Sequence, residues 1–307
     1  RPRGCGGARA GALSRQHHPL GRRDVQAAPP SLEAMRAPSR LVLAILGVVA
    51  IVVVGAVSAV VAVARMVDPP SPTTTVVGED GQEVVLDWAD YPAHAYLDDP
   101  QDVLDAPRAE EVDAVGEAEL DALEAAVAPV APGLDWTLDE DAGETVFPPS
   151  GGNGYGGPSL HAGYNSPSDV SSGLDEAADW HAIAAALDAE LAALGYEPIA
   201  WYHDRQPYVG ESSSERDADV EAQSGSLDVD EMWRWSGTTM RGAMWISIDL
   251  WDLRRDTAPE DAWPETESGI TLQVGGTVLL EDDEQAYVEG IAPFAGLPRP
   301  EPSHPSD

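Results

Sequence analysis

The chain has 307 residues, of which 43% are hydrophobic and 23% are charged, values typical of a globular protein. All 17 residues of the Lys and Arg class are arginine, which excludes PLP and other Schiff-base enzymes, P-loop NTPases of the usual kind and Ser-Lys hydrolases. The net charge of −37 is concentrated after residue 65, where eight arginines face 52 acidic residues. Such a surface repels phosphate backbones, so we predict no nucleic-acid partner.

Residues 1–40 are rich in Gly, Ala, Arg and Pro and show no periodicity, which predicts a disordered cytoplasmic segment. The first methionine, Met35, opens a short basic stretch that is typical of the start of a membrane anchor. Residues 1–34 are therefore also compatible with translated upstream sequence.

Residues 41–64 form an uncharged apolar segment in which Ser58 is the only polar side chain. A helix of this length, at about 1.5 Å per residue, is roughly 36 Å long and can span a hydrocarbon core of about 30 Å. We predict a single transmembrane helix whose partner is the lipid bilayer. The sequence Ala62-Val63-Ala64 leaves a cleavable signal peptide as the alternative, although signal-peptide apolar regions are only about 7–15 residues long. The only cysteine, Cys5, precedes the segment, so a lipobox is excluded.

The arginines that precede the apolar segment predict its orientation. Arg36 and Arg40 lie on its N-terminal side, whereas Arg65 alone closely follows it. The positive-inside rule then places the N-terminus in the cytoplasm and the C-terminal domain outside a cell membrane that the chain crosses once. Residues 65–82, which contain Pro-Pro, Ser-Pro and a run of Thr, predict an extended linker.

Residues 83–296 are predicted to form one extracytoplasmic α+β domain with two clear helices. The first begins near Pro107 and carries apolar residues at helical spacing up to Pro129. The second has Ser172 as its predicted N-cap, an apolar stripe over 180–194 and Gly195 at its C-terminal end.

Strand signals concentrate in the C-terminal half. Residues 244–251 alternate between aliphatic and polar or Trp side chains, which predicts a strand with one aliphatic face. Residues 270–280 indicate either a hairpin that turns at Gly275-Gly276 or one strand with a bulge. Shorter candidates lie at 133–137, 159–165, 198–203 and 232–236. We predict a mainly antiparallel sheet with the two helices on one face.

Two further segments look irregular. Residues 207–230 contain five serines, two glycines and seven acids, which predicts a long mobile loop. The Pro-rich residues 297–307 predict a disordered tail without a core element.

The sequence GGNGYGGPS at 151–159 satisfies the G-x-G-x-x-G pattern. A dinucleotide site needs a strand before this pattern and a helix after it, but Pro148-Pro149 and Pro158 flank it, so we reject that interpretation. A tight surface turn or a loop whose backbone contacts a ligand remain.

The other polar motifs are weak. The histidines lack metal-ligand spacing, and no G-x-S-x-G occurs, so we predict no metal, no cofactor and no assignable catalytic residue. His203 with Asp204 is the one imaginable acid-base pair. The carboxylates favour solubility over a dedicated cation-binding surface, although weak calcium binding stays open.

All nine tryptophans follow the apolar segment, and Trp245 and Trp251 flank Ser247 and Asp249 on one predicted strand. Such a face suits stacking on the sugar rings of a cell-wall polymer, whereas an ordinary core role is the alternative. The candidate ligand-binding residues are Gly152, Asn153, Gly154, Tyr155, Gly157, Tyr164, Asn165, Ser166, Trp245, Asp249 and Trp251.

The order of these features resembles the LppA-like lipoproteins and related membrane-anchored proteins of actinobacteria, over about residues 85–302. The resemblance rests on GGNGYGGPSL at 151–160, GYNSPS at 163–168, LGYEP at 194–198, Trp235-Ser236-Gly237 and APFAGLPRPE at 292–301. It implies an envelope location and no established enzymatic activity, with the peptide helix replacing the lipid anchor.

Together these observations predict a membrane-anchored envelope protein that is a non-enzymatic binding or structural module. Its partners would be a cell-wall polymer or another envelope protein. A hydrolase that uses a carboxylate or His203 is the alternative, and it requires a closed cavity with convergent polar groups.

Overall fold

The computed structural model describes residues 69–304, apart from residues 79, 98, 139–143, 148–151 and 257–266. The predicted cytoplasmic segment 1–40 and the predicted transmembrane helix 41–64 lie outside the described residues. Within the described ranges, no helix is both long and apolar enough to cross a bilayer.

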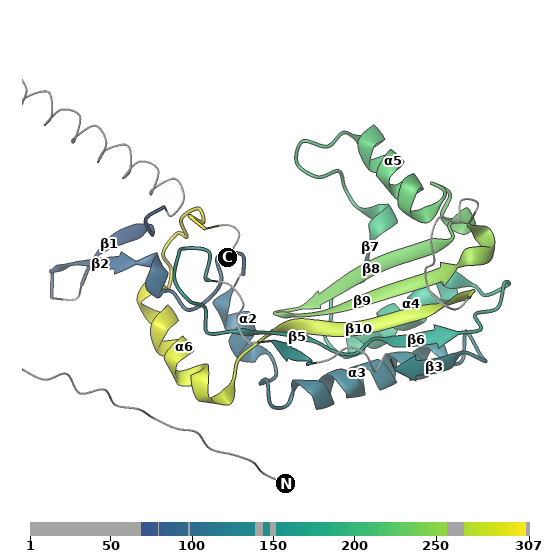
Figure 1. Cartoon of the computed structure of the whole chain (residues 1–307), viewed down its shortest axis with the longest axis horizontal. Coiled ribbons are helices and arrows are strands. Elements are labelled where there is room, and N and C mark those ends of the chain that lie inside the picture. The colour runs from purple at the N-terminus through teal and green to yellow at the C-terminus, as the bar shows by residue number, and fades with distance from the viewer. Residues whose placement is uncertain are drawn as a thin grey trace, which may run out of the picture. The chain divides into compact units, whose positions relative to one another are not determined.

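An eight-stranded sheet forms the centre of the fold (Figure 1). The described strands are β1 (Thr73–Val77), β2 (Glu83–Asp87), β3 (Asp135–Leu138), β4 (Val146–Phe147), β5 (Ala162–Asn165), β6 (Asp169–Ser172), β7 (Ala200–Trp201), β8 (Arg234–Arg241), β9 (Met244–Asp252) and β10 (Ser268–Val278). The main path runs β3-β6-β10-β9-β8-β7, while β5 pairs with β10 and β4, and β1 forms a separate hairpin with β2. Each of these described pairs is antiparallel.

Two long helices cover one face of this sheet, as predicted. The described helices are α2 (Pro100–Asp105), α3 (Val112–Val127), α4 (Trp180–Ala193), α5 (Ser213–Ser224) and α6 (Glu284–Ile291). In Figure 1, α3 and α4 lie on the same side of the sheet and pack against each other. The register agrees, because Tyr164, which reaches α3, and Trp235, which contacts Trp180 of α4, project from the same sheet face.

The alternation along β9 is confirmed. Met244, Ile246, Ile248 and Leu250 are buried under the helices, whereas Trp245, Ser247 and Asp249 are half-buried on the opposite face. We call that opposite face of β8, β9 and β10 the open face.

Gly275 and Gly276 do not form a hairpin turn, so that interpretation is wrong. Both lie inside β10, which pairs with β9 from Ser268 to Gly276 without a bulge. A glycine is needed because the ring of Trp245 lies across Gly275, and a Cβ there would overlap it. Trp251 lies across Gly269 in the same way.

The predicted mobile loop at 207–230 contains α5 instead. Ser212 and Glu215 form a capping box, and Gly225, with φ of 82°, ends the helix in the left-handed conformation. Arg205 holds the segment through ion pairs to Glu211 at 2.7 Å and Asp219 at 2.9 Å. The acids that made this stretch look like a loop therefore include the ion-pair partners that anchor it.

Smaller differences also follow from local hydrogen bonds. Asp179, and not Ser172, caps α4 by accepting from Ala182 N. The predicted linker contains β1, which β2 pairs along its whole length. Within the predicted tail, His304 N donates a hydrogen bond to Gly154 O at 3.0 Å. An extended Pro-rich segment can therefore pack on the domain although it forms no helix or strand.

A buried ion pair joins the helices to the sheet. Glu119 of α3 accepts from Arg241 of β8 at 2.7 Å and from Tyr196 Oη at 2.8 Å. The guanidinium also lies 4.4 Å from the centre of the Tyr196 ring and donates to Leu194 O at 3.0 Å. The carboxylate is thus fully compensated, as a buried charge requires.

We expect Gly275→Ala to destabilise the protein by about 1–3 kcal/mol, because its Cβ displaces the Trp245 ring from the central strand. Urea unfolding of the full chain in non-ionic detergent, followed by circular dichroism, measures this. Gly163→Ala is the matched control, since nothing lies within 4 Å of its Cβ. Equal unfolding midpoints for the two variants would contradict the glycine-tryptophan packing.

Candidate functional site

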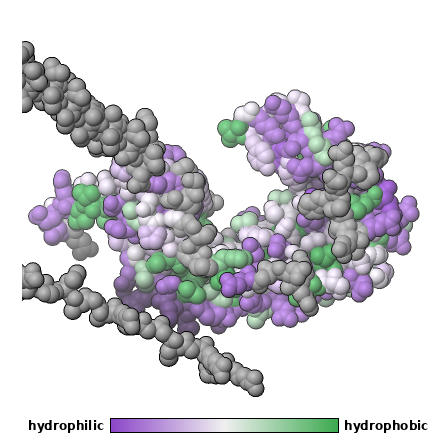
Figure 2. Space-filling view, viewed as in Figure 1, coloured by the Kyte–Doolittle hydropathy of each residue, from purple (hydrophilic) through white to green (hydrophobic). Residues whose placement is uncertain are grey.

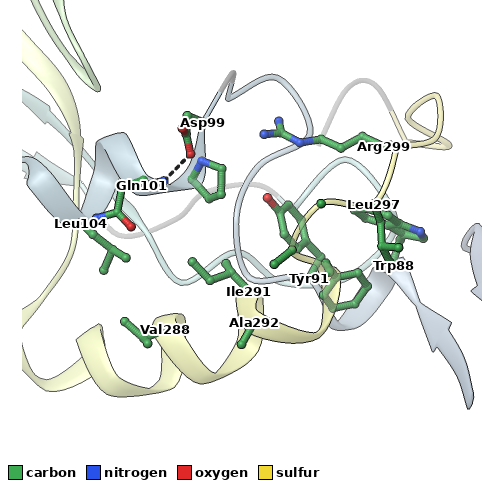
Figure 3. Close-up of a pocket in the computed structure, with 14 residues that line it drawn as sticks. Trp88, Tyr91, Asp99, Gln101, Leu104, Val288, Ile291, Ala292, Leu297 and Arg299 are labelled. Carbon is green, nitrogen blue, oxygen red and sulfur yellow. Dashed lines mark hydrogen bonds between the residues drawn. The ribbon is translucent and has the colours of Figure 1, made fainter. Parts of the chain in front are cut away.

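A groove of 470 Å³ opens between α2, α6 and the segment that contains the short 3-10 turn η1 (Trp88–Asp90) (Figure 3). Leu104 projects from α2, while Val288 and Ile291 project from α6. Arg299 lies along another side of the groove. We call it the aromatic groove, and its defining residues are Trp88, Tyr91, Leu104, Val288, Ile291 and Arg299.

The rings behind the groove pack as one cluster. The Trp88 ring centre lies 5.3 Å from Tyr91, 5.3 Å from Tyr155 and 4.8 Å from Phe294, in tilted or edge-on arrangements that favour aromatic pairs. The indole nitrogen of Trp88 donates to Thr74 Oγ1 at 2.9 Å. The wall of the groove is therefore fixed to β1.

Asn153 of the glycine-rich loop holds this wall in place. Its side chain is fully buried, and its amide nitrogen donates to Trp88 O at 2.8 Å and Tyr91 O at 2.6 Å. Its carbonyl oxygen accepts from Tyr155 N at 2.9 Å and Gly157 N at 3.1 Å. The loop thus acts as a brace behind the groove.

The glycines of the loop allow close backbone approach. A Cβ on Gly157 would overlap the carbonyl of Ala89, and Gly154 has φ of 81°. The predicted loop residues Gly152, Asn153, Gly154, Tyr155 and Gly157 are brought together, but none of them lines the groove. Their contact with a ligand stays a prediction, while their packing against the wall is observed.

The described lining of the groove carries one charge of each sign, from Arg299 and Asp99. Arg299 donates to Leu97 O, and it is the only basic residue among the described lining residues. Burial raises the pKa of Tyr91, which the charge of Arg299 partly opposes, and burial also raises the pKa of Tyr287 behind it. The described lining includes Asp99 and Tyr91 and no histidine, serine or cysteine.

The second predicted loop lies at a different cavity of 380 Å³, between α3 and the β5–β6 connection. Tyr164 and Ser166 line it together with five carboxylates, and Asn165 is exposed outside it. Ser166 also supports the fold, because its hydroxyl accepts from Val274 N at 3.0 Å. We call this cavity the acidic cleft.

The predicted tryptophan face is only partly accessible. Trp251 is 4% exposed, and Trp245 is half-buried. Asp249 forms an ion pair with Arg234 at 2.6 Å between them on the open face. Trp251 is therefore buried on the open face against Gly269, outside the main core cluster.

His203 lies in an aromatic cluster, apart from both cavities. Its ring stacks on Trp201 at 6.0 Å and lies 5.1 Å from the Trp235 ring. It belongs to the 3-10 turn η3 (Tyr202–Asp204), not to a strand, so Asp204 can approach to 3.8 Å. Burial lowers the pKa of His203 against the opposing effect of Asp204, and Nδ1 has no partner among the described residues.

The groove residues on α2 and α6 were missed at the sequence level. Leu104, Val288 and Ile291 belong to short helices, of six and eight residues, that carry too few turns for a clear apolar period. Tyr287 and Ile291, spaced by four residues before Pro293, are the signal that could have found α6.

Comparisons with known proteins are limited. No family model matches the chain, and no curated protein matches it. Among solved structures the chain is similar to the protein described as lipoprotein LppA from Mycobacterium tuberculosis, with 11% identity over 60% of this chain and 86% of that chain. The TM-score of this match is 0.33.

We expect Asn153→Ala to lower the free energy of unfolding by about 2–4 kcal/mol, because it leaves several buried backbone groups without a partner. Urea unfolding of the full chain measures the change. Asn165→Ala, at an exposed position on β5, is the control and should unfold like the original chain. A similar loss in both variants would argue against the brace.

Proposed function

We propose that this chain is a single-pass envelope protein whose folded part lies outside the membrane and is a non-enzymatic binding module. The aromatic groove is its binding site, and an aliphatic chain with an anionic end is its ligand. The apolar segment 41–64 and the arginines before it support the anchor and the orientation.

The observation that carries the binding proposal is the aromatic groove itself. Its volume of 470 Å³ falls within the range of small-molecule sites, and its walls come from apolar side chains on α2 and α6. Val288 is 43% exposed, which leaves apolar surface for a ligand to cover. Arg299, which lines the groove together with Asp99, supplies the positive charge for an anionic end group, such as the carboxylate of an acyl chain.

The hydrolase alternative finds little support in the geometry. It requires His203 and the two glycine-bearing loops to meet in one cavity, but His203 lines neither the aromatic groove nor the acidic cleft. The first loop lies behind the groove, and the second lines the cleft. Contact with a cell-wall polymer through the open face is also disfavoured, because Trp251 is covered.

The proposed orientation predicts a defined labelling pattern. In a Cys5→Ser background, the S214C variant on α5 should react with a membrane-impermeant maleimide in intact spheroplasts. The S39C variant, just before the apolar segment, should react only after lysis. Reaction of S39C in intact spheroplasts would reverse the topology, and recovery of S214C in a soluble, shortened form would indicate a cleaved signal peptide.

The groove should take up an acyl chain in the membrane. Membranes that contain the full chain are irradiated with a photoactivatable fatty acid, and the protein is cut with trypsin. Because the chain has no lysine, the groove helix α6 lies in the peptide that starts at Asp256, separate from segment 41–64. We expect labelling of the Asp256 peptide.

The matched variants for this experiment are Val288→Glu in the groove and Val85→Glu on β2. Both side chains are exposed, at 43% and 63%, so neither substitution disturbs the core. Val288→Glu should reduce labelling of the Asp256 peptide at least fivefold, and Val85→Glu should leave it unchanged. Labelling confined to the peptide that contains 41–64 would refute a ligand in the groove.

A further inference from the structure

The acidic cleft is formed by one face of α3 and the connection from β5 to β6. Asp113, Glu117, Asp121 and Glu124 follow one another at spacings of three or four residues, which places them along one side of the helix. Asp169 faces them from the start of β6. The apolar side chains in the lining are Leu120, Leu138 and Pro167.

The cleft carries five carboxylates and no compensating cation. Among the described residues, no basic side chain lines the cleft, and none of the five carboxylates takes part in an ion pair. The described arginines are engaged elsewhere, for example Arg241 with Glu119 and Arg234 with Asp249. The negative potential of the cleft is therefore available to a ligand.

Two of the carboxylates are close enough to share a proton. Burial first, and then a hydrogen bond and the negative charge of Asp169, raise the pKa of Glu124 to about 7. Asp121 adds further repulsion, and burial also raises the pKa of Asp169. The cleft therefore relieves its charge by holding a proton in the absence of a cation.

Tyr164 provides an independent sign of a missing ligand. Its side chain is 1% exposed, and it lines the cleft with its hydroxyl against Gly116 on the carboxylate-bearing helix. In the part of the chain that the structure describes, no residue forms a hydrogen bond with this hydroxyl. The oxygen is not one of the fully enclosed atoms without a partner, so it can be reached from the cleft, and a donor that enters the cleft can bind it.

The spread of the carboxylates argues for an organic cation. No three His, Cys, Asp or Glu side chains among the described residues come together as ligands of one metal ion. Asp113 and Glu124 lie eleven residues apart, roughly 16 Å along a helix at about 1.5 Å per residue. Separated charges on an aliphatic stem can reach several of these carboxylates at once and suit the apolar wall of Leu120, Leu138 and Pro167.

We propose that the acidic cleft binds aliphatic diammonium compounds. One ammonium group lies at the Glu124–Asp169 pair, and the second donates to Tyr164 Oη and Asp113 toward the N-terminal end of α3. The stem lies on the apolar side chains. Burial and the charges of Asp113 and Glu119 raise the pKa of Tyr164 to about 12, so its hydroxyl remains neutral and able to accept.

The test is calorimetric titration of the full chain, in non-ionic detergent at fixed ionic strength, with 1,5-diaminopentane. We expect it to bind at least tenfold more tightly than pentylamine, because the second ammonium adds charge-assisted hydrogen bonds. 1,5-Pentanediol, the neutral analogue, should not bind. N-acetyl-lysinamide represents a lysine side chain of a protein, and an affinity equal to that of the diamine would overturn the preference for two ammonium groups.

Three variants locate the binding. Tyr164→Phe should weaken diamine binding three- to tenfold, and the double variant Glu124→Gln with Asp169→Asn should weaken it more than tenfold. The control double variant, Glu197→Gln with Glu221→Gln, removes the same charge at exposed positions and should change affinity less than twofold. An equal loss of affinity in the control would mean that general charge attraction explains binding, and it would overturn the site. Unchanged affinity in Tyr164→Phe would overturn the site as well.

Proton release on diamine binding is a second measurement, and general charge attraction between the protein and the diamine does not produce it. The cation favours the ionised form of Glu124, so its pKa of about 7 falls on binding and a proton leaves near pH 6.5. Asp113, Glu117, Asp121, Asp169 and Tyr164 are the other titratable groups that face it. Titrations in buffers of different ionisation enthalpy should show proton release in the original chain and none in the Glu124→Gln, Asp169→Asn variant. No proton release in the original chain would contradict the shared proton.

Discussion

Basic side chains are few in this fold, and several of the ion pairs that they form connect elements that lie far apart in the sequence. Eight arginines face 52 acidic residues after residue 65, and seven of the eight form ion pairs with carboxylates among the described residues. Some of these pairs are local, such as Arg216 with Asp217, and others join separate elements. Arg241 reaches from β8 to Glu119 on α3, Arg108 reaches Glu284 at the start of α6, and Arg205 anchors α5.

The two cavities differ in the charged residues that line them. The aromatic groove is lined by Arg299 and Asp99, whereas the acidic cleft has carboxylates and no arginine in its described lining. The two share no described lining residue, so an apolar anion and an organic cation could occupy them independently. Figure 2 shows the surrounding surface, where hydrophilic side chains cover α5 and apolar ones gather over the β1–β2 hairpin, which exposes Val77, Val84 and Val85.

The two distinctive loops support these cavities in different ways. Asn153 satisfies five backbone groups of its own loop and of the segment from Trp88 to Tyr91, and this makes it a structural residue of the groove wall. Tyr164, from the second loop, spans from the sheet to α3 and ends in the cleft without a partner among the described residues. The Asn153 side chain is thus fully hydrogen-bonded within the protein, whereas the Tyr164 hydroxyl forms no hydrogen bond with the described residues.

The sequence by itself determined the elements whose periodicity is long enough to be read. These are α3, α4 and β9, together with the antiparallel arrangement and the helix-covered face, because apolar spacing along a single element specifies which side is buried. Only the tertiary structure decided that Gly275 lies inside a strand, that the acidic stretch after Pro207 forms α5, and which residues meet in each cavity. Those outcomes depend on partners far away in the chain, such as Trp245 across Gly275 and Arg205 beside Asp219, and no local pattern specifies such partners.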